Sequence, residues 1–293
     1  MRRGGSAELP DKTGADGITV IEPSRTLFGF NRKELWEFRD LIWLFAKRDL
    51  LIVYKQTVLG PLWFIIQPVL MTLLFTVVFG RIANINTGGI PHIIFFMSGM
   101  VLWNYLSAVT SHTAQTLRAN FGILSKVWFP RLVLPIAAVI TNLAHLALGF
   151  CVFLVFYIVE LSKGADMAPT LWLLALPLLV VHVSCLGLAV GMWIAAVSVK
   201  YRDLALALPI FMQIWMFASP IIYPAAGVVD PALRMLLLLN PLAPALELFR
   251  HALTGSGSVE ALPIAAACAI TALLFFGGLA VFEKTQRNFV DVV

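Results

Sequence analysis

Charged side chains are scarce in this sequence. Asp, Glu, Lys and Arg make up 13% of its 293 residues, whereas apolar residues make up 60%. A soluble globular domain has roughly 25% charged and 45–50% apolar residues. The composition therefore excludes an ordinary soluble fold and predicts that much of the chain lies in a membrane.

Cysteine is also rare, and its placement argues against metal or redox chemistry. The three cysteines, Cys151, Cys185 and Cys268, fall inside apolar stretches, and no C-x-x-C pair occurs. This placement favours the interpretation that the cysteines are small, buried apolar residues. The five histidines are scattered, and none pairs with a second histidine or a carboxylate at the spacing of a metal site. We expect no metal centre.

Motifs for nucleotide binding and covalent catalysis are missing as well. No G-x-x-x-x-G-K-[ST] occurs, so a P-loop for ATP is excluded, and no G-x-S-x-G nucleophile turn appears. The apolar stretches hold almost no ionisable side chains other than histidine, which argues against transport driven by protons or sodium ions. Residues 1–22 lack the apolar core of a secretory signal peptide.

Long stretches free of Asp, Glu, Lys and Arg dominate what is present. Each exceeds the roughly 20 residues that an α-helix needs to cross a bilayer. These stretches are Gln56–Gly80, Ile82–Leu117, Leu132–Val159, Met167–Val199, Leu204–Val229 and Ala261–Phe282. The sequence therefore predicts an all-α polytopic membrane protein with six transmembrane helices, the fifth of them at about 204–223.

The basic residues predict the orientation of these spans. Of the 21 Lys and Arg residues, 17 lie in the N-terminal region, in the loops after the second and fourth spans, and in the C-terminal tail. Cytosolic segments carry the excess of Lys and Arg. Both termini are therefore expected in the cytosol, and the net charge of +5 reflects membrane topology rather than nucleic-acid binding.

The N-terminal region divides into two parts. Residues 1–30 are polar and glycine-rich and are expected to form a disordered cytosolic tail, ahead of a permease domain at 31–293. Residues 31–48 place Leu35, Phe38 and Ile42 on one helical face, with charged residues around much of the rest. This pattern predicts an amphipathic helix in the cytosolic interface. A soluble helix packed against another subunit is the alternative.

The stretch between the fifth and sixth spans has a different character. Residues 233–253 are apolar but are interrupted by Asn240-Pro241, Pro244, Glu247 and Arg250. The apolar pieces on either side are too short to cross a bilayer. They favour re-entrant or interfacial helices on the non-cytosolic side.

Five motifs occur in a fixed order between about residue 35 and the C-terminus. The first is Arg48-Asp49 followed by YKQTVLGPLWFIIQP at 54–68. Gly60-Pro61 within it comes near the start of an uncharged stretch, and proline at the first turn of a helix loses no hydrogen bond. The others are KVWFPRL at 126–132, YRD at 201–203 followed by SPIIYP at 219–224, Asn240-Pro241 with Glu247 and Arg250, and the ending FVDV at 289–292. Together they resemble ABC transporter permeases that export lipid-linked polysaccharides such as O-antigen, teichoic acid or capsule.

This resemblance implies a function and a set of partners. Two copies of the chain would form the membrane half of an exporter in the bacterial inner membrane, and a lipid-linked glycan would pass through a channel between them. Two copies of a separate ATPase subunit, which bind ATP and Mg²⁺, would dock on the cytosolic side. The chain itself would then be a transport subunit rather than an enzyme, with no cofactor of its own. A drug or lipid exporter of the same fold is the nearer alternative, and a membrane-embedded glycan-modifying enzyme is the distant one.

Three groups of residues are candidates for specific roles. The predicted cytosolic segment between the second and third spans is expected to contact the ATPase through a short helix that ends at Phe129, because Pro130 disfavours helix there. Its candidate coupling residues are Arg118, Phe121, Leu124, Lys126, Trp128 and Arg131. Amide and aromatic side chains in the first and fifth spans are expected to line the channel, and the alternative is that the aromatic ones form interfacial belts or pack between helices. The candidate channel residues are Trp63, Phe64, Gln67, Gln213, Trp215 and Phe217.

The third group is a predicted outer gate formed by Asn240, Pro241, Glu247 and Arg250. Glu247 and Arg250 are three residues apart, so they would share one helix face and could pair. The alternative is that both charges contact lipid head groups.

Overall fold

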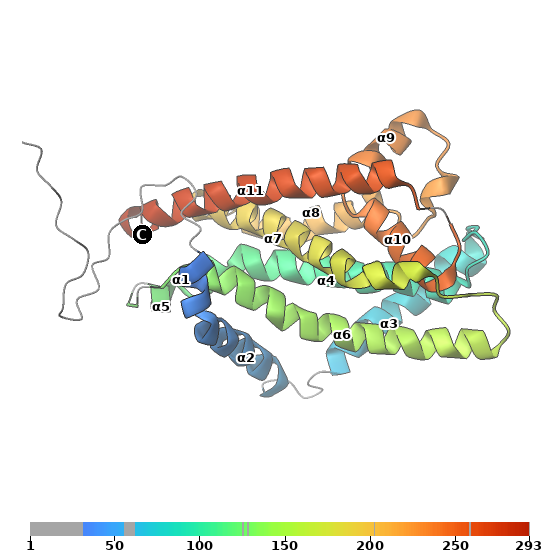
Figure 1. Cartoon of the computed structure of the whole chain (residues 1–293), viewed down its shortest axis with the longest axis horizontal. Helices are drawn as coiled ribbons and strands as arrows, with labels where there is room; N and C mark the ends of the chain where they lie inside the picture. Colours follow the sequence, from blue (N-terminus) through green and yellow to red (C-terminus); the bar gives the residue numbers. More distant parts are fainter. Residues whose placement is uncertain are drawn as a thin grey trace, which may run out of the picture. The chain divides into compact units, whose positions relative to one another are not determined.

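The computed structural model describes residues 32–55, 62–124, 126–127, 129–201, 203–257 and 259–292. Within these ranges the secondary structure is helical and contains no strand, as the sequence predicts (Figure 1). The predicted tail at 1–30 and the Gly60-Pro61 step lie outside the described residues. The boundary expected near residue 30 therefore stays a prediction.

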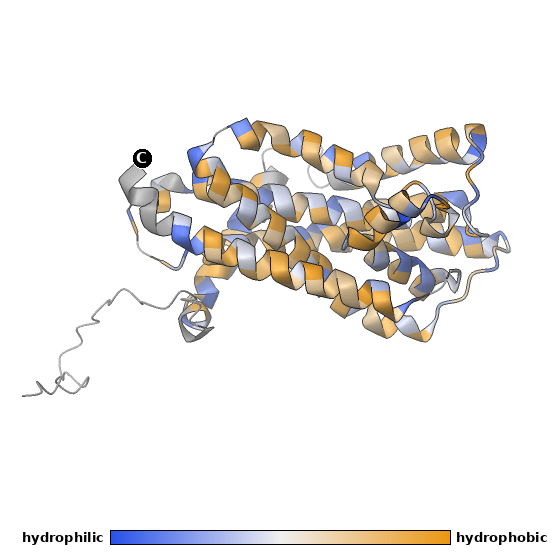
Figure 2. Cartoon of the chain, turned by 90° about the horizontal axis from the view of Figure 1, so that it is seen from above, coloured by the Kyte–Doolittle hydropathy of each residue, from blue (hydrophilic) through white to orange (hydrophobic). Residues whose placement is uncertain are grey.

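Five helical segments of the described chain are long and apolar enough to cross a membrane. The first, Ile65–Ile82, combines the end of α3 (Trp63–Phe75) with the π-helical η2 (Thr76–Ile82). The second and third are α4 (His92–Ala119) and α6 (Val133–Ser162). The fourth, Leu171–Lys200, combines η3 (Leu171–Ala175) with α7 (Leu176–Lys200), and the fifth is Ala261–Thr285 within α11 (Ala261–Val292). This confirms the all-α polytopic fold. Hydrophobic residues follow the length of these helices, and hydrophilic ones gather toward their ends (Figure 2).

The predicted fifth span is shorter than expected. Its helix, α8 (Asp203–Ala218), has 16 residues and contains Pro209. At 1.5 Å per residue it is about 24 Å long, less than the roughly 30 Å hydrocarbon thickness of a bilayer. The chain then leaves the helix in a turn at 219–223, where the sequence prediction had continued the span.

The predicted re-entrant region forms two helices that meet at a sharp corner. Helices α9 (Pro231–Leu239) and α10 (Ala243–Thr254) are bent by 85° relative to each other. Asp230 caps α9 by accepting hydrogen bonds from the backbone amides of Ala232 and Leu233. Because Asn240-Pro241 separates the two helices, we call this feature the α9–α10 corner.

Helix α4 is the centre of the described core. Its membrane window is 78% buried, whereas the other four windows are 17–33% buried. It packs against α3, α6, α7, α8 and α10, and α7 packs in turn against α11. The core around α4 is rich in aromatic and branched residues, including Phe95, Phe96, Phe153, Leu186 and Ile221.

Two glycines allow α4 and α7 to approach closely. A Cβ atom built at Gly187 would lie 2.8 Å from Cγ1 of Val109, and one at Gly191 would lie 2.5 Å from Cβ of Thr113. Any other residue would push the helices apart. Gly187 and Gly191 are four positions apart on one helix face, a spacing that brings membrane helices into close contact.

The predicted amphipathic helix is present and extends beyond residue 48. It consists of α1 (Arg32–Glu37) and α2 (Arg39–Lys55). Ile42, Phe45 and Ala46 of α2 are buried against Phe129 and the first turns of α6. In contrast, Trp36 and Trp43 are 70% and 63% exposed, which suits a location at the lipid head groups.

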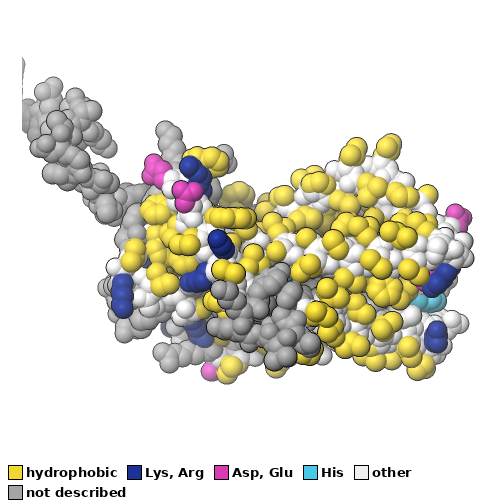
Figure 3. All heavy atoms as spheres, turned by 90° about the horizontal axis from the view of Figure 1, so that it is seen from below, with side chains coloured by type: hydrophobic (Ala, Val, Ile, Leu, Met, Phe, Trp, Pro, Cys, Tyr) yellow, Lys and Arg dark blue, Asp and Glu magenta, His cyan; other side chains and the backbone are white. Residues whose placement is uncertain are grey.

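Apolar side chains also cover much of the outer surface. In the face seen in Figure 3, hydrophobic atoms dominate, and most Lys, Arg, Asp and Glu side chains gather toward the two ends. Exposed residues of this kind include Leu70, Val155, Leu174, Ile210, Ile214 and Leu273. A surface so apolar is suited to lipid or to another membrane-embedded subunit.

Candidate functional site

Arg250, one of the predicted gate residues, is the most deeply buried cation that the structure describes. It projects from α10 and is only 5% exposed. Its guanidinium donates hydrogen bonds to the carbonyl oxygens of Pro220 (2.7 Å) and Ile221 (3.0 Å), in the turn that follows α8. It also donates to the Phe95 carbonyl and the Ser98 hydroxyl of α4 and lies 3.6 Å from the Phe95 ring centroid. Arg250 therefore connects α10, α4 and the end of α8.

The sequence suggests that Glu247 and Arg250 pair, but the two side chains do not form a salt bridge in the structure. Within the described chain, no nitrogen of Arg250 lies within 4.0 Å of a Glu247 oxygen. Backbone carbonyls left free where α8 ends attract the guanidinium instead, because a buried cation needs several acceptors. Glu247 is half-buried and lines two cavities beside α10, one of them shared with Arg234 and Glu260.

Asn240 and Pro241 hold the α9–α10 corner against its neighbours. The Asn240 side chain accepts a hydrogen bond from the Trp215 indole (3.1 Å) and donates one to the Ser219 hydroxyl (2.8 Å). The carbonyl oxygen of Pro241 lies 3.1 Å from Nε2 of His182 on α7. The four predicted gate residues are thus neighbours around one corner, and their role in gating stays a prediction.

The connection between α4 and α6 carries the predicted coupling residues. The exposed Arg118 donates a hydrogen bond to the Ser198 carbonyl, which ties the end of α4 to the end of α7. Helix α5 (Phe121–Leu124) ends at Leu124, five residues before the predicted end at Phe129. Lys126 is exposed, and Arg131 is half-buried. Trp128 and the side chain of Phe121 lie outside the described part.

Burial in this connection differs from the sequence expectation. Leu124 is half-buried against two internal clusters, so it is only partly available to a partner. Among the side chains of this connection that the structure describes, the exposed apolar ones are those of Ile123 (38%) and Val127 (57%), which were not among the predicted coupling residues. A helix of four residues has no clear hydrophobic periodicity, so no sequence signal could distinguish the exposed positions from the buried ones.

The predicted channel residues fall into two environments. Trp63, Gln67, Gln213 and Phe217 are exposed. Trp215 is half-buried and packs edge-on against Trp103, with 6.1 Å between ring centroids. The side chain of Phe64 is outside the described part. Whether this group faces a channel stays a prediction.

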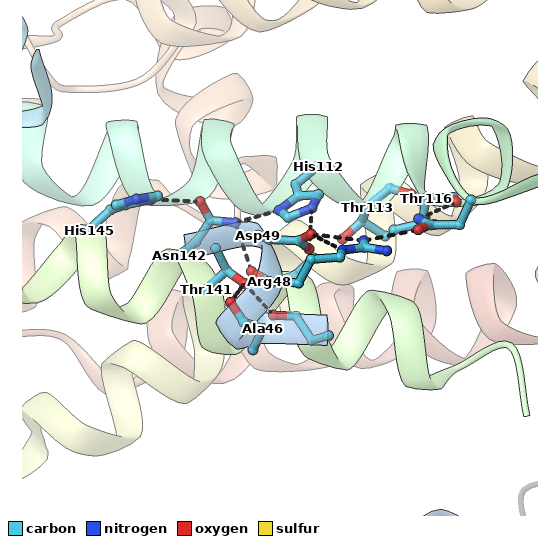
Figure 4. A network of polar contacts seen from close by, with 12 residues as sticks. Ala46, Arg48, Asp49, His112, Thr113, Thr116, Thr141, Asn142 and His145 are labelled. Atoms are coloured by element: carbon cyan, nitrogen blue, oxygen red, sulfur yellow. Dashed lines mark hydrogen bonds and ion pairs between the residues drawn. The ribbon is translucent and has the colours of Figure 1, made fainter. Parts of the chain in front are cut away.

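A polar network that the sequence analysis missed connects α2, α4 and α6 (Figure 4). On α2, Arg48 contacts Asp49 at 2.8 Å and donates to the Asn120 side chain at 3.0 Å. Asp49 lies 3.4 Å from Nε2 of His112 on α4. Asn142 of α6 then lies 3.3 Å from Nδ1 of His112.

The direction of the hydrogen bonds in this network can be assigned. The Asn142 amide nitrogen can only donate, so Nδ1 of His112 accepts, which leaves Nε2–H of His112 to donate to Asp49. Burial alone would raise the pKa of Asp49, but the hydrogen bonds from His112 and Arg48 outweigh it and keep the pKa below its ordinary value. Asp49 therefore acts as an anion that holds α2 against α4.

The described residues contain no cluster of three or more His, Cys, Asp or Glu side chains that could hold a metal ion. Cys151, Cys185 and Cys268 are free thiols, and the prediction that they are buried is wrong for Cys151 and Cys268, which are exposed.

Known proteins match this chain over most of its length. Residues 40–254 match the family described as ABC-2 type transporter. The O-antigen export system permease protein RfbA of Myxococcus xanthus is 28% identical over 263 residues, which cover 89% of this chain and 98% of that protein. A Klebsiella pneumoniae protein of the same name is 24% identical, with 87% and 95% covered. The polysialic acid transport protein KpsM of Escherichia coli is also 24% identical, with 78% and 87% covered.

Proposed function

Because the chain belongs to the ABC-2 type transporter family, we propose that it is the membrane-spanning permease of an ATP-driven exporter. Its substrate is a lipid-linked polysaccharide of the O-antigen kind, which moves across the bacterial cytoplasmic membrane. The observation that carries this proposal is the alignment with an O-antigen export permease over 98% of that protein's length.

The architecture supports a transport role for a pair of chains. A polymer needs a wide polar path, and α4 fills the centre of the single described bundle with side chains. Two copies related by a two-fold axis are the simplest way to enclose such a path between them. The exposed apolar surface of α3 and α8 offers faces on which a second copy can pack.

ATP hydrolysis in this proposal belongs to a separate subunit. The sequence contains no P-loop, so the energy must come from a partner that binds ATP and Mg²⁺. The connection at 118–131 is the proposed contact, with both termini on the same cytosolic side. Exposed Ile123 and Val127 next to Lys126 provide apolar contact area with a positive charge beside it.

A deletion of the gene in its native host tests the function. Loss of polysaccharide from the cell surface, with lipid-linked polysaccharide accumulating inside, is the expected result, and the restored gene should reverse both. If the surface polysaccharide is unchanged while efflux of drugs or lipids falls, the chain is an exporter of the other kind. If the polysaccharide reaches the surface but lacks a chemical substituent, the chain is a glycan-modifying enzyme.

A further inference from the structure

A cavity lined by both polar and apolar residues lies between α3, α4 and α6, away from the α9–α10 corner and from the α4–α6 connection. Its volume is about 250 Å³, enough for several water molecules at about 30 Å³ each. The lining positions are near the start of α3 and in the middle parts of α4 and α6. The polar residues that line it are Gln67, Asn104, Tyr105, Ser107, Ser111 and His145.

Four of these polar side chains lack a protein partner. Tyr105 is hydrogen-bonded to Ser184, and His145 to Asn142. Within the described residues, no hydrogen bond joins the side chains of Gln67, Asn104, Ser107 or Ser111 to another group. Gln67 on α3 is exposed, and Asn104, Ser107 and Ser111 on α4 are half-buried, so these groups face the cavity from two of its sides. A polar group without a partner at membrane depth is costly, which favours a polar occupant of this space.

The chemistry of the lining restricts the occupant. No Asp, Glu, Lys or Arg is among the described residues around the cavity. A phosphate or pyrophosphate would need cationic partners, and a metal ion would need carboxylates or clustered imidazoles. Amide and hydroxyl groups both donate and accept hydrogen bonds. They therefore match a neutral ligand whose own groups do the same, which is the chemistry of sugar hydroxyls.

We propose that this cavity binds one neutral sugar unit of the exported glycan. The proposal rests on the proposed export function and adds a glycan-binding subsite within a single protomer, distinct from the path between protomers. Asn104 and Ser107 from α4 and Gln67 from α3 supply the hydrogen bonds. The cavity excludes the charged diphosphate of a lipid carrier, which must be bound elsewhere.

Gly149 keeps the cavity open on the α6 side. It lines the cavity, and a Cβ atom at this position would meet only Cγ2 of Val101, at 3.9 Å. A larger side chain would therefore enter the cavity without a backbone clash. Ala147, two positions earlier on α6, is exposed on the outer surface and provides a matched control.

Thiol accessibility tests the occupant directly. In the full transporter, with Cys151, Cys185 and Cys268 replaced by alanine, Ser107→Cys places a thiol in the cavity. Membrane vesicles from cells that make the glycan are compared with vesicles from cells that lack its first glycosyltransferase, and the probe is a charged methanethiosulfonate. We expect rapid labelling without glycan and at least fivefold slower labelling with it. Ala147→Cys, whose thiol lies on the lipid-facing surface, should stay unlabelled by this charged probe in both.

Three results would overturn the proposal. Equal labelling of Ser107→Cys with and without glycan would mean that the cavity holds only water. Labelling by a lipid-soluble maleimide alone would mean that lipid fills it. Absence of labelling by both reagents would mean that the cavity is closed.

Cavity filling provides a second, functional test. Gly149→Leu should lower glycan export at least tenfold while the ATPase still copurifies, and Ala147→Leu should leave export within twofold of the unmodified protein. Normal export by Gly149→Leu would overturn the subsite. Deletion of the gene in the same strain distinguishes a failure of the export function from a failure of the cavity proposal. If deletion leaves surface glycan unchanged, the proposed export function is wrong. If surface glycan depends on the gene but is normal in Gly149→Leu, only the cavity proposal is wrong.

Discussion

Arg250 shows how a single residue can join three elements. Its guanidinium donates four hydrogen bonds to acceptors on α4 and in the turn after α8. A lysine ammonium is a point charge with three donors and cannot reproduce this fork. Even a substitution that keeps the charge should therefore leave buried carbonyls unsatisfied.

We expect Arg250→Lys to lower the free energy of unfolding by about 2–5 kcal/mol, because hydrogen bonds to a buried charge are lost. Thermal unfolding of the detergent-purified protein, followed by size-exclusion chromatography, measures the effect. Arg234→Lys, at an exposed position on α9, is the control and should be neutral. Equal melting temperatures for the two variants would contradict a structural role for Arg250.

Asp49 gives the second prediction at this scale, and it concerns pH. Because the pKa of folded Asp49 is lowered, its contacts stabilise the protein at pH values above the unfolded pKa of about 4. That contribution is lost as the pH falls through the lowered folded pKa. The melting temperature of Asp49→Asn should therefore lie below that of the unmodified protein at neutral pH, and the difference should disappear in strong acid. A difference that grows in acid would refute the assignment.

At the scale of whole helices, the close contact between α4 and α7 depends on Gly191. Gly191→Ala places a methyl group 2.5 Å from Cβ of Thr113 and 2.9 Å from the Thr110 carbonyl oxygen, so the helices must separate. Overpacking of this kind costs about 1–3 kcal/mol. Gly149→Ala, where the nearest atom is 3.9 Å away, is the matched control. Melting temperatures that fall for Gly191→Ala alone would support the close contact, and equal values would argue against it.

Hydropathy alone predicts most of the helices in this fold, but it does not predict where every helix ends. Uncharged stretches of more than 20 residues predict α4, α6, α7 and α11 because the bilayer leaves a chain few alternatives. The end of α8 at Ala218 was missed because hydropathy continues past it. What stops the helix is a turn whose carbonyls bond to Arg250, and no local pattern contains that distant partner.

The sequence predicts some residues of the candidate sites and misses others, because some contacts depend on partners far away in the sequence. Asn240, Pro241 and Arg250 stand out in sequence because polar residues and proline are rare in apolar stretches. The pairing of Asp49 with His112 joins residues 63 positions apart, and only the packing of both α2 and α4 against α6 brings them together. In a sequence, charged residues near a membrane interface are usually interpreted as contacts with lipid head groups. The sequence alone therefore could not show that Asp49 contacts His112 within the protein.

At the scale of the whole molecule, the helical bundle formed by the described residues has two ends with different surfaces. The connection at 118–131 and the C-terminal end of α11 lie at one end, and the α9–α10 corner lies at the other (Figure 1). If the ATPase docks at the first end, exposed apolar side chains there should matter and equally exposed ones at the second end should not. Ile123 and Val127 at the first end and Leu171 (88% exposed) at the second provide this comparison.

We therefore expect Ile123→Asp combined with Val127→Asp to reduce copurification of the ATPase at least tenfold and to abolish export, because a desolvated carboxylate cannot enter an apolar contact. The fold should survive, since both side chains already face solvent. Leu171→Asp should leave copurification unchanged. Pull-down of the tagged ATPase, with melting temperature as the folding check, measures the outcome. If the double variant folds and still binds the ATPase as well as Leu171→Asp does, the docking surface lies elsewhere on the chain.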